Sequence, residues 1–311
     1  MLAIIFPGQG SQSIGMGRDF YDNFPRVRDI FEEIADETGI DIKEIINNNP
    51  ENKLNITEYS QICIFSISIS IFQTIKDLLG NRITEKIKFM AGHSLGEYSA
   101  LAASESLGIH KCAQLLKSRG KFMQDSYPEY ESGMLAVIGL NINQVEEIMN
   151  KDEKSNFQIA NDNGPQQVII SLNKRNFENV TESLKDRGAK KIVPLNVSAA
   201  FHSSYMKNAE LNLINEFKKL DFKDSKYPII SNFKAKPNQN SREIIHDLEK
   251  QITSRVRWTE TINFLEKNKI LHIIEVGPNK VLSGLSKRIS NNFTFTNVSN
   301  IKELEDLKNA I

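Results

Sequence analysis

Cysteine is almost missing from this sequence. Its 311 residues include only two cysteines, Cys63 and Cys112, and each stands alone in an apolar stretch. A disulfide framework needs paired cysteines, and a zinc site needs clustered cysteine and histidine ligands, so we expect neither. So few thiols fit a reducing compartment, and we predict a cytoplasmic protein.

An excess of charge is missing too. Lys and Arg together number 39, as do Asp and Glu, so the formal net charge is zero. Bulk electrostatics therefore gives no reason to expect nucleic acid as a partner, although a local basic patch for an acidic partner stays open. The longest apolar run, Ile62–Phe72, is interrupted by three serines and is too short to span a membrane. The N-terminal Met1–Pro7 lacks a basic leader, so we expect no signal peptide and no membrane.

What is present is the composition of a globular protein, with 40% hydrophobic and 25% charged residues. The length allows one large or two unequal domains. Leu2–Phe6 and Leu271–Val276 read as buried strands, and Phe20–Thr38 and His110–Met123 have helical periodicity. Within Ile62–Phe72 isoleucine and serine alternate with the period of a strand, but the apolar stretch continues too far, so we predict a buried helix.

From Gly133 the sequence changes to short alternating units. The pattern β-α-β-β-α-β is that of a ferredoxin-like unit, with a turn expected at Asp162–Pro165. Its predicted strands are Met134–Ile138, Phe157–Ala160, Val168–Ser171 and Lys191–Leu195, and its predicted helices include Val145–Met149 and Phe177–Arg187.

The most informative motif is Gly92-His93-Ser94-Leu95-Gly96, a G-x-S-x-G pentapeptide. The apolar Ile87–Ala91 before it suits a strand, and Glu97–Ala103 after it suits a helix. A serine on a strand-to-helix turn is a nucleophile elbow, in which the hydroxyl is exposed and the helix N-terminus favours developing negative charge. The alternative is a serine between glycines in an ordinary loop, which this context makes weaker.

A serine hydroxyl needs a base. Of the five histidines, His202 lies in a loop of small residues, Val197–Met206, and follows Ser94 in chain order as in α/β hydrolases. His93 adjoins Ser94, but the side chain before the nucleophile of an elbow normally points away. No acid between Ser94 and His202 stands out, which suggests a Ser–His dyad oriented by a group other than a carboxylate. The competing interpretation of His202 is a bland core or surface histidine.

The loop Gly8-Gln9-Gly10 follows the first strand. A dinucleotide fingerprint would need glycine at position 13, where the chain has Ser13. The alternative is an oxyanion hole, in which a backbone N–H from this loop acts together with the N–H of Leu95, the residue after the nucleophile.

Together these stretches resemble the malonyl-CoA:acyl carrier protein transacylases of fatty acid biosynthesis, from Leu2 to about Ile289. The matching motifs, in order, are Phe6-Pro7-Gly8-Gln9-Gly10-Ser11-Gln12, Gly92-His93-Ser94-Leu95-Gly96-Glu97-Tyr98-Ser99-Ala100, Arg119-Gly120-Lys121-Phe122-Met123-Gln124, Val197-Ser198-Ala199-Ala200-Phe201-His202-Ser203 and Glu275-Val276-Gly277-Pro278-Asn279-Lys280-Val281-Leu282.

The resemblance implies a role for each catalytic residue. Ser94 takes the acyl group as an ester, and His202 is the general base and then the general acid. The backbone N–H groups of Gln9 and Leu95 hold the oxyanion. Gln251 corresponds to the glutamine whose carbonyl orients the histidine.

The resemblance also implies a substrate. Arg119 pairs with the free carboxylate of the malonyl group, and Phe201-His202 matches the malonyl-selective form of the motif. Gln9 and His93 are further candidate substrate-binding residues. From its position alone, Arg119 in Lys117–Lys121 reads as a solvated charge near a helix end.

The sequence departs from the family at three positions. Arg255 stands where proline is usual, Ala200 stands where proline often precedes the aromatic-His pair, and Gln166 stands where glycine is common. Because proline restricts its own backbone and that of the preceding residue, the absence of two prolines makes the nearby loops less rigid, but it leaves the expected catalytic residues unchanged.

We therefore predict a larger α/β-hydrolase-like domain, residues 1–131 and 197–311, with an inserted ferredoxin-like small subdomain, residues 132–196. The expected activity is transfer of malonyl from malonyl-CoA through Ser94 to the phosphopantetheine thiol of acyl carrier protein, by a monomer without metal or cofactor. The alternatives are a free-standing acyltransferase of a polyketide synthase, a serine hydrolase or thioesterase, and a catalytically silent protein that docks carrier proteins.

Overall fold

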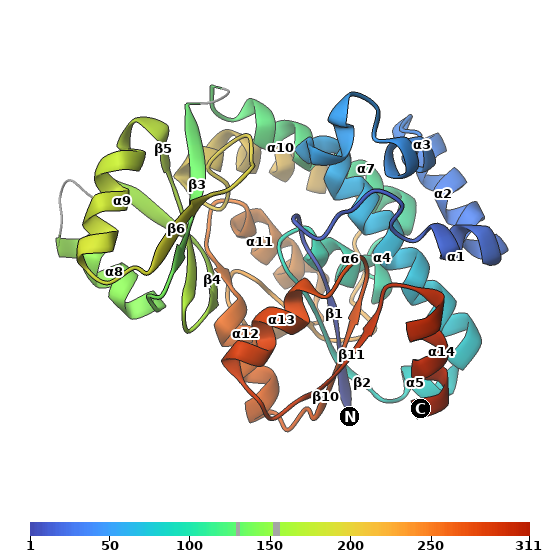
Figure 1. The fold of residues 1–311 in the computed structure, drawn as a ribbon. Helices are drawn as coiled ribbons and strands as arrows, with labels where there is room; N and C mark the ends of the chain where they lie inside the picture. Colours follow the sequence, from blue (N-terminus) through green and yellow to red (C-terminus); the bar gives the residue numbers. More distant parts are fainter. Residues whose placement is uncertain (129–130, 152–155) are drawn as a thin grey trace.

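Two β-sheets of different kinds organise the chain (Figure 1). A computed structural model describes residues 1–128, 131–151 and 156–311. One sheet has six strands in the order β11-β10-β1-β2-β7-β8 and is parallel except for the β7–β8 pair. The other has five strands in the order β6-β3-β5-β4-β9 and is antiparallel except for the β4–β9 pair. The fold is therefore mixed α/β, as the sequence predicts.

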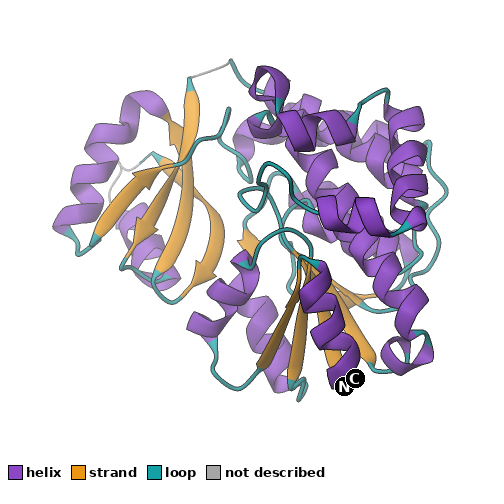
Figure 2. Cartoon of the chain, turned by 45° about the vertical axis from the view of Figure 1, so that its right-hand side comes forward, coloured by secondary structure: helices purple, strands orange, loops and turns teal. Residues whose placement is uncertain are grey.

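The strands of the six-stranded sheet are β1 (Leu2–Phe6), β2 (Ile87–Gly92), β7 (Ile229–Ile230), β8 (Pro237–Asn238), β10 (His272–Val276) and β11 (Thr294–Val298). Those of the five-stranded sheet are β3 (Ser132–Ile138), β4 (Phe157–Gly164), β5 (Gln167–Asn173), β6 (Lys191–Pro194) and β9 (Val256–Arg257). The helices are α1 (Arg18–Asn23), α2 (Pro25–Thr38), α3 (Ile42–Asn48), α4 (Thr57–Leu79), α5 (Asn81–Thr84), α6 (Gly96–Ala103), α7 (Ile109–Asp125), α8 (Ile142–Lys151), α9 (Phe177–Asp186), α10 (Lys207–Phe217), α11 (Ser241–Gln251), α12 (Trp258–Lys267), α13 (Val281–Ile289) and α14 (Ile301–Ala310). Figure 2 shows the five-stranded sheet set apart from the six-stranded sheet.

The pairing of β1 with β2 positions the site. Both strands are almost fully buried, and they run parallel with Phe6 beside Gly92 at their ends. The carboxyl ends of parallel strands meet at one edge of a sheet, which is where ligands bind in open α/β folds. The Gly8 loop after β1 and the Ser94 turn after β2 therefore emerge side by side.

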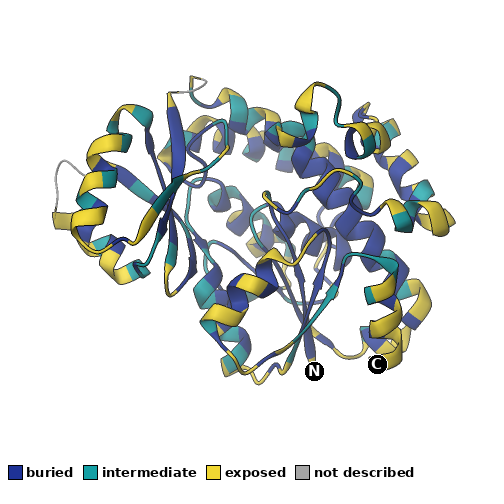
Figure 3. Ribbon diagram, viewed as in Figure 1, coloured by how far each residue is buried: buried dark blue, intermediate teal, exposed yellow. Residues whose placement is uncertain are grey.

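The apolar stretch around Ile62–Phe72 forms the middle of α4, a helix of 23 residues, as predicted. By length and composition α4 could cross a membrane, so the expectation that no run reaches that length is wrong. However, 78% of its most apolar window is buried inside the protein, where it packs against α2, α6 and α7. Ser66 suits this core because its hydroxyl donates to the backbone carbonyl of Ile62 at 2.8 Å. Figure 3 shows the buried centre and the exposed outer faces of the peripheral helices.

Two predictions of local structure are wrong. The helix expected over Phe20–Thr38 is two helices, because Pro25 disfavours helical geometry at Phe24 (φ −119°, ψ 113°) and then begins α2. The turn expected at Asp162–Pro165 lies later, since β4 continues to Gly164. Two register shifts in the β4–β5 pairing accommodate its polar residues within the strand.

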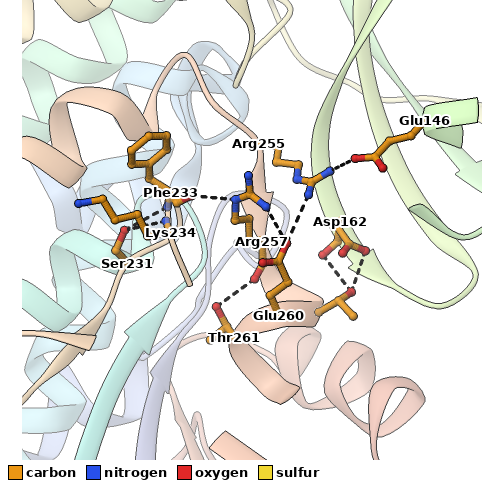
Figure 4. Close-up of polar contacts among 10 residues, drawn as sticks. Glu146, Asp162, Ser231, Phe233, Lys234, Arg255, Arg257, Glu260 and Thr261 are labelled. Atoms are coloured by element: carbon orange, nitrogen blue, oxygen red, sulfur yellow. Dashed lines mark hydrogen bonds and ion pairs between the residues drawn. The ribbon is translucent and has the colours of Figure 1, made fainter. Parts of the chain in front are cut away.

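The two sheets are joined by β9, which pairs with β4 through Asn161–Val256 and Asp162–Arg257. Figure 4 shows the charged side chains beside this junction. Arg255 forms ion pairs with Glu146 of α8 and, at 3.3 Å, with Glu260 of α12. Arg255 thus links helices on both sides of the junction by its side chain.

Candidate active site

Ser94 lies on the turn between β2 and α6, in a conformation that disfavours most residues. Its φ is 53°, in the left-handed region. The flanking glycines make this turn possible because the backbone passes close to itself. A Cβ on Gly92 would lie 1.9 Å from the carbonyl carbon of Gly96, and one on Gly96 would lie 2.2 Å from the carbonyl oxygen of Phe6. The geometry is that of a nucleophile elbow.

His202 lies against Ser94. Its Nε2 is 2.8 Å from Ser94 Oγ, and its Nδ1 is 2.9 Å from the backbone carbonyl oxygen of Gln251. A carbonyl oxygen only accepts, so Nδ1 carries the ring hydrogen and Nε2 is free to accept the serine proton. The group that orients the histidine is thus a backbone carbonyl, in the arrangement that the family resemblance implies for Gln251.

Burial and the nearby charge of Arg119 lower the pKa of His202 to about 3. Its imidazole is therefore neutral at physiological pH and can accept a proton. Burial also lowers the pKa of His93.

Arg119 is fully buried in the middle of α7 and is not a solvated charge near a helix end. Its Nη2 donates to Ser94 Oγ and to Gln251 Oε1, both at 3.0 Å, and its Nη1 donates to Gln61 Oε1 at 2.7 Å. Within the described parts of the chain, no carboxylate lies within salt-bridge distance of its guanidinium. A buried cation without an anionic partner next to a nucleophile suits an anionic substrate.

A cavity of about 310 Å³ opens beside Ser94 and His202. Gln9 and Met123 line it from the side of the six-stranded sheet, and Met134 and Asn161 line it from the five-stranded sheet. The remaining lining residues are Gly10, Gln12, Asn55, His93, Leu195, Asn196, Val197 and Phe201. The position between the two sheets is typical of a substrate site.

The remaining predicted site residues also lie here. Gln9 faces the cavity, and Leu95 is the buried residue that precedes α6, at the helix end that favours an anion. His93 lines the cavity, contrary to the expectation for the residue before a nucleophile, and its Nε2 lies 2.9 Å from Asn163 Oδ1 of β4.

Two residues of this region went unnoticed in the sequence, Glu97 and Asn232. Asn232 accepts the backbone N–H of Ser94 at 2.7 Å through Oδ1 and donates from Nδ2 to the carbonyl of Gly92 at 2.6 Å. Glu97 Oε2 accepts the backbone N–H of Asn232 at 3.1 Å and Gln251 Nε2 at 2.8 Å. A glutamate in the first turn after an elbow was a signal that could have been read, whereas Asn232 follows a strand of two residues and offered none.

Over the described ranges, no three His, Cys, Asp or Glu side chains are grouped so as to hold a metal ion.

Comparison with known proteins identifies the family. Residues 3–303 match the acyl transferase domain family. The chain is 35% identical to the malonyl CoA-acyl carrier protein transacylase of Staphylococcus aureus (strain MRSA252), over 98% of this chain and 97% of that protein, and 35% identical to the one of Bacillus subtilis, over 98% and 95%. Its fold superposes on the acyl-carrier-protein S-malonyltransferase of Bartonella henselae with a TM-score of 0.95, at 36% identity over 99% and 98% of the two chains. A malonyl-transacylase solved in complex with its type II polyketide acyl carrier protein gives a TM-score of 0.93, at 33% identity over 99% of each chain. The chain therefore belongs to the acyl transferase family, among the malonyl-CoA:acyl carrier protein transacylases.

Proposed function

We propose that this protein transfers a malonyl group from malonyl-CoA to the phosphopantetheine thiol of an acyl carrier protein, through an ester on Ser94. The observation that carries the proposal is the buried guanidinium of Arg119, whose Nη2 lies 3.0 Å from Ser94 Oγ and which has no carboxylate within salt-bridge distance in the described chain. A malonyl group on Ser94 would bring its free carboxylate to this cation. The names of the relatives support the same donor and acceptor.

In the first half-reaction Ser94 Oγ attacks the thioester carbonyl carbon, and its proton passes to His202 Nε2, 2.8 Å away. The tetrahedral intermediate collapses as the carbon–sulfur bond breaks. The leaving thiolate takes the proton back from His202, so the products are free coenzyme A and malonyl-Ser94.

The second half-reaction runs the same steps in reverse order with a new thiol. The phosphopantetheine thiol gives its proton to His202 and attacks the ester carbonyl, and Ser94 Oγ leaves with that proton. We propose that the N–H groups of Gln9 and Leu95 hold the oxyanion in both steps. The positions of Gln9 at the cavity and of Leu95 before α6 support this role.

Arg119 gives this chemistry its selectivity. A guanidinium can grip a carboxylate through two parallel hydrogen bonds, and a buried one is left uncompensated by an acetyl group. The same grip holds the acyl group for the carrier thiol, so that water is poorly placed to attack. We propose that Gln9 and His93, which line the cavity, contact the rest of the acyl chain.

We also propose the finer description of the fold and its location. The order β6-β3-β5-β4 supports a ferredoxin-like subdomain, residues 132–196, inserted into an α/β-hydrolase-like domain, residues 1–131 and 197–311. The low cysteine content supports a cytoplasmic protein.

A second candidate acceptor is the carrier protein of a polyketide synthase. The structural likeness to a malonyl-transacylase in complex with such a carrier favours it. The two acceptors involve the same chemistry at Ser94, and competition between the two purified carrier proteins for malonyl-enzyme separates them.

The test is to isolate the acyl-enzyme and to time its decay with and without a holo-carrier protein. We expect the ester to persist in buffer and to disappear quickly when the carrier thiol is added, with malonyl appearing on the carrier. Decay to free malonate at a rate that the carrier does not change would identify a hydrolase and refute the proposal.

A further inference from the structure

The backbone of Ser94 is held on both sides by side-chain amides. Its N–H donates to Asn232 Oδ1 at 2.7 Å, and its carbonyl accepts Gln251 Nε2 at 2.9 Å as well as the helical N–H of Glu97 at 3.1 Å. A non-glycine residue with φ of 53° persists only where its surroundings hold it. The two amides are therefore part of what keeps the nucleophile in place.

Asn232, through its backbone N–H, and Gln251, through its side-chain amide, both donate to one oxygen atom. Glu97 Oε2 accepts the backbone N–H of Asn232 at 3.1 Å and the side-chain Nε2 of Gln251 at 2.8 Å. Gln251 in turn accepts from Arg119 through Oε1 and supports His202 through its backbone carbonyl. One carboxyl group behind the elbow thus links the turn after β7, the end of α11 and the nucleophile turn.

The turn that carries Asn232 is itself fixed. The hydroxyl oxygen of Ser231 accepts the N–H groups of Phe233 at 3.1 Å and Lys234 at 3.2 Å, and Arg257 Nε donates to the carbonyl of Phe233 at 2.8 Å (Figure 4). These bonds hold the residues that follow Asn232, whereas the backbone N–H of Asn232 itself is held by Glu97.

The buried surroundings of Glu97 allow its carboxyl group to be protonated near neutral pH. Its side chain is buried, and the charged groups that act on it are Arg119 of α7 and Asp247 of α11. Asp247 lines the same small cavity of about 10 Å³ as Glu97 and is paired with Lys234 at 2.7 Å. Burial raises the pKa of Glu97 to about 7. A protonated carboxyl group keeps one acceptor oxygen, which the amide of glutamine reproduces.

We propose that Glu97 is a positioning residue of the acyl transfer: its Oε2 anchors Asn232 and Gln251, and through them holds the nucleophile Ser94 in its left-handed conformation. This role rests on the proposed function only in that Ser94 is the nucleophile. What Glu97 contributes is a hydrogen-bond acceptor and not a negative charge.

The test compares Glu97→Ala, Glu97→Gln and wild type by two rates: malonylation of Ser94 by malonyl-CoA, and covalent labelling of Ser94 by an alkyl fluorophosphonate, a serine-directed reagent that carries no malonyl group. We expect Glu97→Ala to slow both rates on the order of 10- to 100-fold, with an unchanged KM for malonyl-CoA, because the hydroxyl is misplaced while the cavity stays intact. Glu97→Gln should restore both rates to within a few-fold of wild type.

Glu275→Ala is the matched control. Glu275 is also buried, and it accepts the backbone N–H groups of Leu282 at 2.9 Å and Ser283 at 2.7 Å. None of these contacts involves Ser94, Asn232 or Gln251. It should lower Tm like Glu97→Ala and leave the labelling rate of the folded protein unchanged. A second control is the double variant with Asn232→Ala, whose loss should be smaller than the product of the two single losses, because the route through Asn232 is shared and only the route through Gln251 is lost in addition.

The labelling rate decides this inference independently of the donor. Normal fluorophosphonate labelling of folded Glu97→Ala would overturn it, as would a Glu97→Gln variant as slow as Glu97→Ala, or losses that multiply in the double variant. Wild type that is labelled by the fluorophosphonate but not by malonyl-CoA would instead refute the proposed function and leave the role of Glu97 to be judged from labelling alone.

Discussion

Arg119→Ala should reverse the acyl preference of the enzyme. The guanidinium is fully buried, 3.0 Å from Ser94 Oγ, and its described hydrogen bonds go to neutral oxygen atoms. The variant removes the cation that a malonyl carboxylate would meet. It also removes the uncompensated charge that an acetyl group would leave buried.

The expected loss follows from the burial of this pair. Truncating one partner of a buried, hydrogen-bonded charge pair costs about 2–5 kcal/mol, so kcat/KM for malonyl-CoA should fall about 30- to 5,000-fold. Acetyl-CoA should lose far less, since it loses only the contacts of Arg119 with protein atoms, chiefly Ser94 Oγ and Gln251 Oε1. Arg119→Lys should give an intermediate result, because an ammonium keeps the charge without the paired geometry.

The assay measures kcat/KM for malonyl-CoA and acetyl-CoA in wild type, Arg119→Ala and Lys117→Ala. Lys117 lies on the same helix and donates to the backbone carbonyl of Thr38 at 2.6 Å, so it controls for loss of a cation from α7. It should leave the preference unchanged. An equal proportional loss for both donors in Arg119→Ala would refute the assignment of Arg119 to the carboxylate.

Three further predictions follow from the electrostatics. Because the pKa of His202 is lowered to about 3, single-turnover acylation should stay constant as the pH falls through 6.5, and its acidic limb should move to higher pH in Arg119→Ala; a wild-type limb near 6.5 would contradict this. Because the pKa of Glu97 rises from 4.5 to about 7 on folding, unfolding releases its proton at pH values between these two. The free energy of unfolding of wild type should therefore fall by about 3 kcal/mol relative to that of Glu97→Gln as the pH rises through this window. A difference in unfolding free energy between the two proteins that stays constant with pH in urea unfolding would exclude this. Arg255→Ala should cost less than about 1 kcal/mol, since its ion pair with Glu146 is partly exposed, and a double-mutant cycle with Glu146→Gln that shows larger coupling would contradict this.

The sequence was informative where the structure is local. The elbow needs only a strand, a serine between glycines and a helix, so Gly92–Gly96 could be read directly. The buried helix α4 could be predicted from the length of its apolar stretch although isoleucine and serine alternate within it. Within this helix the hydroxyl of Ser66 donates to the backbone carbonyl of Ile62, so a serine there can be buried and does not mark a solvent-facing position as it would in a strand.

The sequence was uninformative where burial depends on distant segments. In the sequence Arg119 lies among lysines and looks like a solvated charge near a helix end. It is buried because α4 and α11 pack against it and provide Gln61 and Gln251 as hydrogen-bond partners. Asn232 reaches the nucleophile from 138 residues away, after a strand of only two residues. No local periodicity encodes such contacts, and the predicted role of Arg119 rests on the family resemblance rather than on the residues alone.

The central claim is that Ser94 carries the malonyl group between coenzyme A and the carrier. The most direct measurement is the intact mass of the protein after mixing with malonyl-CoA, with the site read by peptide fragmentation, in wild type and Ser94→Ala. We expect one added malonyl group on Ser94 of wild type, its removal by a holo-carrier protein, and no adduct on a folded Ser94→Ala. Malonyl on another residue, or an adduct that persists in Ser94→Ala, would contradict it.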